Sequence, residues 1–152
     1  MRTSNVITIR APLDVIFNTA ADLARWPDFL THYRYNSFLS PMPWGGIVKM
    51  SAVRSGIPTT WISIYRIDTQ RCQLHFEHIR SALNATKGMI VVWNFTQDPD
   101  GIRVEITHDL DLRWPLIGGL VGKYMVGHFF IHHIATRTLA GLKRKVEGSP
   151  SS

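Results

Sequence analysis

A long amphipathic segment at the end of the chain, preceded by short strand-like runs, places the strongest limit on what this sequence can fold into. From Leu116 to Val146, one set of residues recurs every three or four positions, which is typical of a helix face. Gly148 and Pro150 follow and are expected to end the helix. The residues of this face are Leu120, Tyr124, His128, Ile131, Ala135, Leu139, Leu142 and Val146. A helix of this length needs another element to cover that face.

The strand-like runs are rich in β-branched and aromatic residues and are separated by Gly, Pro, Asn and Asp, as in antiparallel hairpins. After the first run, residues from Leu13 to about Ala24 have helical spacing. Trp26-Pro27 is expected to end that helix, because the residue before a proline is pushed out of the helical region. A second short helix is expected from Pro27 to Tyr33. The predicted strands are 5–10, 35–39, 47–53, 59–68, 72–79, 89–97 and 102–112.

This order of elements predicts an α+β fold. A curved antiparallel sheet of about seven strands would wrap the long C-terminal helix, with two short helices after the first strand, and would enclose a pocket for an apolar ligand. This arrangement is a helix grip. The 152 residues suit one domain, so we expect a single domain over residues 1–152, with 148–152 as a flexible tail.

Composition and charge narrow the class of protein. The chain is 45% hydrophobic and 18% charged, in the range of globular proteins. Its net charge of +6 favours acidic partners in general, but the basic residues cluster only at 143–145. Nucleic-acid binding is not expected, because no basic stripe with interleaved aromatic residues is visible. A single cysteine, Cys72, excludes an internal disulfide and suits a reducing cytoplasm.

No membrane span is expected. The most apolar stretch, Trp114 to Ala135, contains Lys123, three histidines and four glycines. A lysine near the centre of a bilayer costs about 2.5 to 3.5 kcal/mol. At the N-terminus, polar residues interrupt the apolar ones, so no signal-peptide core is present and we expect a cytoplasmic protein.

Several segments of the chain carry a recognisable family pattern. They are Ile9-Arg-Ala-Pro-Leu-Asp-Val-Ile-Phe, Ala21-Asp-Leu-Ala-Arg-Trp-Pro-Asp-Phe-Leu with Tyr33, Trp61-Ile-Ser-Ile-Tyr-Arg-Ile-Asp, the strand with Trp93, Thr107-His-Asp, and Leu142-Lys-Arg-Lys-Val-Glu. Together they resemble the START-like SRPBCC superfamily, and within it the polyketide cyclase/dehydratase (aromatase/cyclase-like) branch. The similarity runs from about Val6 to Glu147. It implies the helix-grip fold, on which cyclases, lipid carriers, quinone binders and hormone receptors have all been built.

The resemblance also implies catalytic residues. Alternation puts Trp61, Ser63 and Tyr65 on one face of their strand, and the family comparison turns this face inward. Aromatase/cyclases have an arginine where this chain has Tyr65, while Arg66 points away. A phenol donates a hydrogen bond to a carbonyl or enolate but lacks a fixed positive charge. Tyr65, Tyr33 and a helix histidine are therefore the candidates for acid, base and oxyanion stabilisation.

Other candidates would line the pocket. Trp93 matches a tryptophan that lines the cavity of cyclases, and ordinary core packing is the alternative. The family places Trp26 at the cavity as well, and the alternative for Trp26 is a structural plug between helix and sheet. On the last strand, His108 shares a face with Val104 and Ile106, either as a hydrogen-bonded core histidine or as a ligand contact.

The long helix carries His128, His132 and His133, and a plausible alignment puts His132 at a cavity position of the family, with His133 one register away. His132 is the preferred titrating candidate, and exposure at the pocket mouth is the alternative. Tyr124 and His128 are predicted to contact the ligand. His128 and His132 are four residues apart, but this spacing alone is weak support for a metal, so no metal and no cofactor are predicted.

Two functions compete, and a stand-alone regulatory or partner-binding module is a third interpretation. The first is a cofactor-independent polyketide cyclase/dehydratase that receives its substrate from an acidic acyl carrier protein, which the net charge would favour. The second is a non-catalytic carrier of a lipid, quinone or aromatic metabolite. A homodimer is left open.

Overall fold

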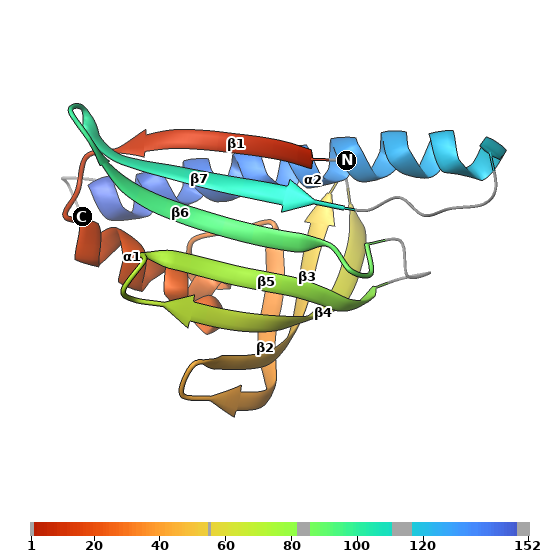
Figure 1. Ribbon diagram of the computed structural model, residues 1–152, viewed down its shortest axis with the longest axis horizontal. Coiled ribbons are helices and arrows are strands. Elements are labelled where there is room, and N and C mark those ends of the chain that lie inside the picture. The colour runs from red at the N-terminus through yellow and green to blue at the C-terminus, as the bar shows by residue number, and fades with distance from the viewer. Residues whose placement is uncertain (1, 55, 82–85, 111–116, 149–152) are drawn as a thin grey trace.

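The computed structural model describes residues 2–54, 56–81, 86–110 and 117–148, with only the backbone at 54 and 117–130 (Figure 1). The elements follow the predicted order of one strand, two short helices, six strands and one long helix. They are β1 (Arg2–Ile9), α1 (Leu13–Ala21), the 3₁₀ helix η1 (Leu23–Asp28), β2 (Tyr33–Met42), β3 (Gly45–Arg54), β4 (Ile57–Asp68), β5 (Gln73–Ser81), β6 (Ile90–Asp98), β7 (Gly101–Asp109) and α2 (Ile117–Glu147).

The strands form one antiparallel sheet in the order β1-β7-β6-β5-β4-β3-β2. Strands β2 to β7 follow one another as hairpins, whereas β1 pairs with β7. The segment with α1 and η1 therefore carries the chain from one edge of the sheet to the other. The sheet curves along α2, which lies beside β1 and β7 in Figure 1. The predicted α+β helix-grip fold is confirmed.

The short helices differ from the prediction. Helix α1 ends at Ala21, and the second helix spans Leu23–Asp28 rather than Pro27 to Tyr33, so Trp26 and Pro27 lie inside it. The reason is the tighter 3₁₀ turn: Arg25 N–H bonds to the Asp22 carbonyl over three residues, and the absent N–H of proline costs little in such a short helix.

Several strands are longer than predicted. β1 begins at Arg2, β2 continues through Pro41, and β4 begins at Ile57 with Pro58 inside. Both prolines lie where a strand lacks one neighbour: β2 is an edge strand, and β5 pairs with β4 only from Trp61 onward. The other strand ends differ from their predicted positions by no more than three residues. The predicted strand end at 111–112, the helix start at 116 and the tail at 149–152 lie outside the described residues.

The core lies on the inner face of the sheet, meaning the side that faces α2. Alternate residues are buried over most of β6 and β7, as predicted, although His108 near the end of β7 is only half-buried. The buried residues are Val91, Trp93, Phe95, Ile102, Val104 and Ile106. Helix α2 covers them with Ile131, Ala135, Leu139 and Leu142. Its last turns are fixed to β1, where the Lys143 Nζ donates to the Thr8 carbonyl (2.6 Å) and Glu147 accepts from the Arg10 N–H (2.9 Å).

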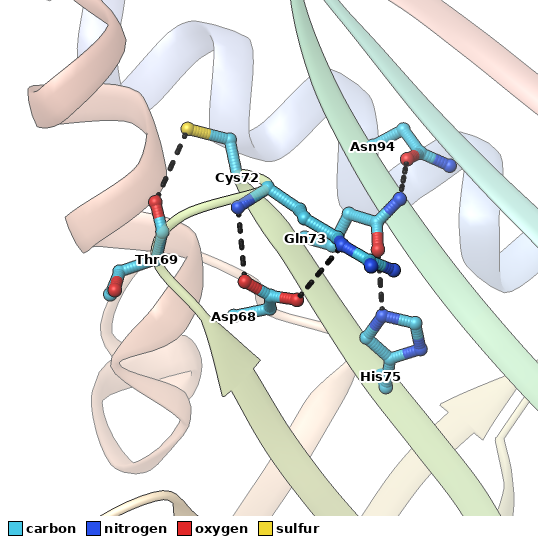
Figure 2. A network of polar contacts seen from close by, with 7 residues as sticks. Asp68, Thr69, Cys72, Gln73, His75 and Asn94 are labelled. Carbon is cyan, nitrogen blue, oxygen red and sulfur yellow. Dashed lines mark hydrogen bonds and ion pairs between the residues drawn. The ribbon is translucent and has the colours of Figure 1, made fainter.

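Polar side chains of β5 and β6 form a network on the outer face. The Gln73 Nε2 donates to the Asn94 Oδ1 (2.6 Å), and the Gln73 Oε1 lies 2.9 Å from the His75 Nε2 (Figure 2). In the preceding turn, Asp68 accepts a hydrogen bond from the Arg71 N–H, and Cys72 has a positive φ of 51°. Alternation thus separates an outer polar face from an inner face that is available for a site.

Gly45 is expected to be indispensable for the β2–β3 hairpin. Its φ is +136°, and a Cβ there would lie 2.1 Å from the Tyr65 carbonyl oxygen on β4. Gly45→Ala should lower the free energy of unfolding by about 3 kcal/mol or more, measured by urea denaturation, because strain and a backbone clash add together. Gly56→Ala is the control: its φ is +78° but its surroundings are open, so about 1 kcal/mol is expected. If Gly45→Ala and Gly56→Ala lost equal stability, the clash with the Tyr65 carbonyl would not contribute to the requirement for Gly45.

Candidate functional site

The inner face of β4 carries the predicted side chains. Trp61, Ser63 and Tyr65 are 8%, 0% and 1% exposed, whereas Arg66 is exposed. The inward orientation predicted for this face is therefore confirmed. The Oγ of Ser63 is buried and has no hydrogen-bond partner. A buried hydroxyl without a partner lowers the stability of the folded protein unless another molecule forms the missing hydrogen bond.

Tyr65 is held by structural contacts. Its hydroxyl donates to the Ala21 carbonyl (2.8 Å), and its ring stacks on Phe76 with 4.7 Å between centroids. Burial, followed by the nearby charge of Asp22, raises the pKa of the phenol far above its usual value. Tyr65 therefore stays protonated at neutral pH, and its proton already has an acceptor at the end of α1.

Tyr33 and His32, at the start of β2, meet α2 at Thr138. The Thr138 hydroxyl donates to the Ile134 carbonyl (2.7 Å), so it accepts from the His32 Nε2–H (2.9 Å). Burial, with the charges of Arg137 and His133, lowers the pKa of His32 to about 4. Burial raises the pKa of Tyr33 well above its usual value, although its hydrogen bond with Thr138 opposes the shift.

Trp26 joins the short helix η1 to the sheet. It is 2% exposed, and its Nε1–H donates to the Ala20 carbonyl (3.0 Å). Its ring lies 5.0 Å from that of Tyr33 and 5.6 Å from that of Trp93, measured between centroids. Trp26 and Trp93 thus belong to a packed aromatic wall together with Phe76.

His78 is an inward polar residue that sequence reasoning missed. It stacks on Trp61 (5.6 Å between centroids, 15° between planes), and its Nδ1 lies 3.0 Å from the Thr86 Oγ1. Burial, and then the charge of His108, lowers the pKa of His78 to about 3. The alternation of Leu74, Phe76 and His78 along β5 was the signal that could have identified it.

His108 faces a polar corner at the β1 edge. Thr3 of β1 is directly opposite His108 of β7, and Asn5 is two residues further along β1. The Thr3 Oγ1, Asn5 Oδ1 and His108 Nδ1 are all buried without a partner. Burial lowers the pKa of His108 to about 4, so the ring is neutral at pH 7. Thr3 was not predicted because the first strand was expected to begin only at Asn5, and Asn5 was not among the predicted site residues.

His132 lies beside this corner on the exposed side of α2. Its Nδ1 is 3.0 Å from the Asn5 Nδ2, which also donates to the Thr136 Oγ1 (3.1 Å). His133 is exposed too, and its charge acts on His32. The structure thus brings His132 to the β1 edge and His133 to the β2 side. The side chains of Tyr124 and His128 lie outside the described residues.

The site is electrically neutral where it is described. Among the described side chains, the buried polar ones are Thr, Asn, Ser and neutral His, with no Asp, Glu, Lys or Arg. A surface depression of about 440 Å³ near the end of α2 is lined by Thr8, Arg10, Asp100, Lys143 and Glu147 and contains none of the predicted site residues. In the same described part of the chain, no group of three metal-ligating side chains gathers, and no helix is long and apolar enough to cross a bilayer.

Comparison with known proteins agrees with this geometry. Residues 9–125 match the family described as polyketide cyclase / dehydrase and lipid transport. The chain belongs to this family. A relative from Streptomyces cyaneus that bears the name "Putative polyketide cyclase" is 26% identical over 113 residues, which cover 73% of each protein.

Solved structures support the fold of this family member. The Zhui aromatase/cyclase of Streptomyces sp. R1128 superposes with a TM-score of 0.85 at 15% identity, covering 97% of this chain and 93% of the other. The protein TTHA0849 of Thermus thermophilus gives a TM-score of 0.81 at 19% identity and 99% coverage of both chains. At sequence identities this low, the similarity to these structures supports the fold alone.

Proposed function

We propose that this family member binds a neutral, oxygen-bearing hydrophobic molecule of polyketide or aromatic type between the inner face of the sheet and α2, and promotes its aldol cyclisation and dehydration. The observation that carries the proposal is the pair of buried atoms without partners, the Ser63 Oγ and the His108 Nδ1, among aromatic side chains. Because β5 and β6 separate β4 from β7, separate ligand oxygens would satisfy the two atoms. The rings of Trp61 and Trp93 would contact the apolar part of the ligand.

An aldol closure needs a base and hydrogen-bond donors, and uncharged side chains such as tyrosine and histidine can fill these roles. A base takes an α proton, the resulting enolate carbon bonds to a carbonyl carbon, and the carbonyl oxygen becomes a hydroxyl; dehydration then removes this hydroxyl with a second α proton as water. Tyr33 and Tyr65 have raised pKa values, so they are proposed as hydrogen-bond donors rather than bases. His132, which is exposed beside Asn5 at the β1 edge, is proposed as the base that takes the α proton from a ligand that reaches this edge. A direct role for Tyr65 requires its bond to Ala21 to break.

A measurement of substrate turnover distinguishes an enzyme from the alternative, a carrier of lipids, quinones or aromatic metabolites. Native mass spectrometry of the protein purified from its host comes first, followed by addition of a poly-β-ketone on an acidic acyl carrier protein. For an enzyme, a ring-closed product that has lost water appears, and Tyr65→Phe or His132→Ala slows it by about a hundredfold. A co-purifying lipid or quinone without turnover would favour the carrier and withdraw the catalytic roles.

Ser63→Ala tests the recognition of a ligand oxygen. It should leave the ligand-free protein as stable as the wild type, or stabilise it by up to about 1 kcal/mol, because an unsatisfied hydroxyl is removed. It should weaken binding of 2-naphthol by about fivefold and leave binding of naphthalene unchanged, as measured by calorimetry or fluorescence.

Ser51→Ala is the matched control, since Ser51 is equally buried but its Oγ accepts from Thr60 (3.4 Å). This change should cost stability and spare naphthol binding. A loss of naphthol affinity in Ser51→Ala but not in Ser63→Ala would reject Ser63 as the oxygen-binding group.

A further inference from the structure

The hairpin of β2 and β3 exposes three large apolar side chains. Leu39, Met42 and Trp44 are 55%, 47% and 43% exposed, and we call them the hairpin tip. Figure 1 shows this hairpin projecting from the sheet on the side away from α2 and β1. Clustered exposed apolar residues of this size indicate a contact surface rather than a core.

Local geometry turns these side chains outward. Phe38 pairs with Val48 and Ser40 with Ile47, so Leu39 is the extra residue of a β-bulge, which redirects its side chain. Trp44 belongs to the two-residue loop between Met42 and Gly45. The guanidinium of Arg66, from β4, lies 5.3 Å from the centroid of the Trp44 ring. A cation is therefore present beside the exposed aromatic ring.

The stretch of sequence that contains the hairpin has basic side chains and no acidic ones. Residues 29–67 contain no Asp or Glu and four basic residues, Arg34, Lys49, Arg54 and Arg66. This quarter of the chain therefore contributes +4 of the net +6, whereas the other 113 residues hold 13 basic and 11 acidic side chains. Arg66 pairs with Gly45 next to the tip, whereas Arg34 and Arg54 lie at the other end of the hairpin. Arg66 is therefore the cation that would meet an anionic surface beside the tip.

We propose that the hairpin tip docks on an anionic lipid bilayer, with Trp44, Met42 and Leu39 entering the interface and Arg66 contacting the lipid headgroups. Tryptophan is enriched at membrane interfaces, and basic residues next to apolar ones add attraction to anionic lipids. A projecting tip suits insertion better than a protein interface, which usually buries about 800 Å² on each partner. Pro41 and Pro43 lack N–H groups, which disfavours strand addition by a second copy.

Vesicle flotation with the full chain tests the docking. The wild type should bind vesicles of phosphatidylcholine with 30% phosphatidylglycerol and bind pure phosphatidylcholine weakly. The triple variant Leu39→Ser, Met42→Ser, Trp44→Ser should lose about tenfold or more in partitioning. Arg66→Gln should lose about fivefold on the anionic vesicles only, since one surface charge is removed.

Matched variants and a fluorescence readout separate docking from a loss of folding. Val6→Thr and Val15→Thr change side chains that are 47% and 43% exposed elsewhere, and they should bind vesicles as the wild type does. Trp44→Phe should still bind, but it should lose the quenching of wild-type fluorescence by brominated lipid. Circular dichroism confirms that each variant is folded.

Three outcomes overturn the proposal. They are wild-type binding that the triple variant retains, quenching that survives Trp44→Phe, and absence of binding to anionic vesicles. If vesicles are ignored while the triple variant loses affinity for an acidic acyl carrier protein, the tip docks on a protein and not on a membrane.

Discussion

Acidification from pH 7.5 to pH 5 is expected to lower the free energy of unfolding by about 4 kcal/mol through His32 and His78 alone. Both are buried, with folded-state pKa values of about 4 and about 3 against 6.5 when unfolded. Between these values the unfolded chain binds more protons than the folded one. Stability from this source is therefore complete above pH 6.5 and is lost as the pH falls towards 4. His108, with a pKa of about 4, acts in the same direction.

Urea denaturation at several pH values between 7.5 and 5, with His32→Gln and His78→Gln, measures this effect. Each variant should show a pH dependence about 2 kcal/mol smaller than that of the wild type, because it removes one titrating ring. The stability of each variant at pH 7.5 gives the cost of its altered packing separately. If all three proteins lost equal stability between pH 7.5 and 5, carboxylates and not these histidines would control acid unfolding.

Trp26→Ala is expected to be the most damaging single substitution among the predicted site residues. It removes a ring that contacts Tyr33 and Trp93, together with the N–H bond to the Ala20 carbonyl. Large-to-small changes of buried aromatic residues cost about 3 to 5 kcal/mol, which is much of the stability of a typical domain. Thermal unfolding should show a large fall in Tm.

Two variants separate the causes of this loss. Trp26→Phe keeps most of the ring and removes the N–H, so about half of the loss is expected. Trp44→Ala removes an equally large but exposed side chain and should cost less than about 1 kcal/mol. If Trp26→Ala instead left Tm nearly unchanged and abolished naphthol binding, Trp26 would be a ligand contact rather than part of the packed wall.

Much of the inner face was predictable because strand alternation has a fixed period of two. It placed Trp61, Ser63 and Tyr65 on one face, which the family resemblance turned inward, and it placed His108 on the face of Val104 and Ile106. The hydrogen-bond partners of these groups were not predictable. The acceptor for Tyr65 is the Ala21 carbonyl, 44 residues away, and the partner of His32 is Thr138, 106 residues away. Contacts across such separations depend on how the short helices and α2 are placed over the sheet.

The succession of strands and helices, and the residues that share a face along β4, β6 and β7, could thus be read from the sequence, since they depend on local patterns of apolar and turn-forming residues. Which polar atoms remain without partners depends on contacts between distant segments and became visible only in the folded structure. The tertiary structure joined the first strand to the last, which placed Thr3 and Asn5 beside His108, and it brought His78 onto Trp61. It also showed that Leu39, Met42 and Trp44 stay outside the core, because burial depends on which segments pack against one another.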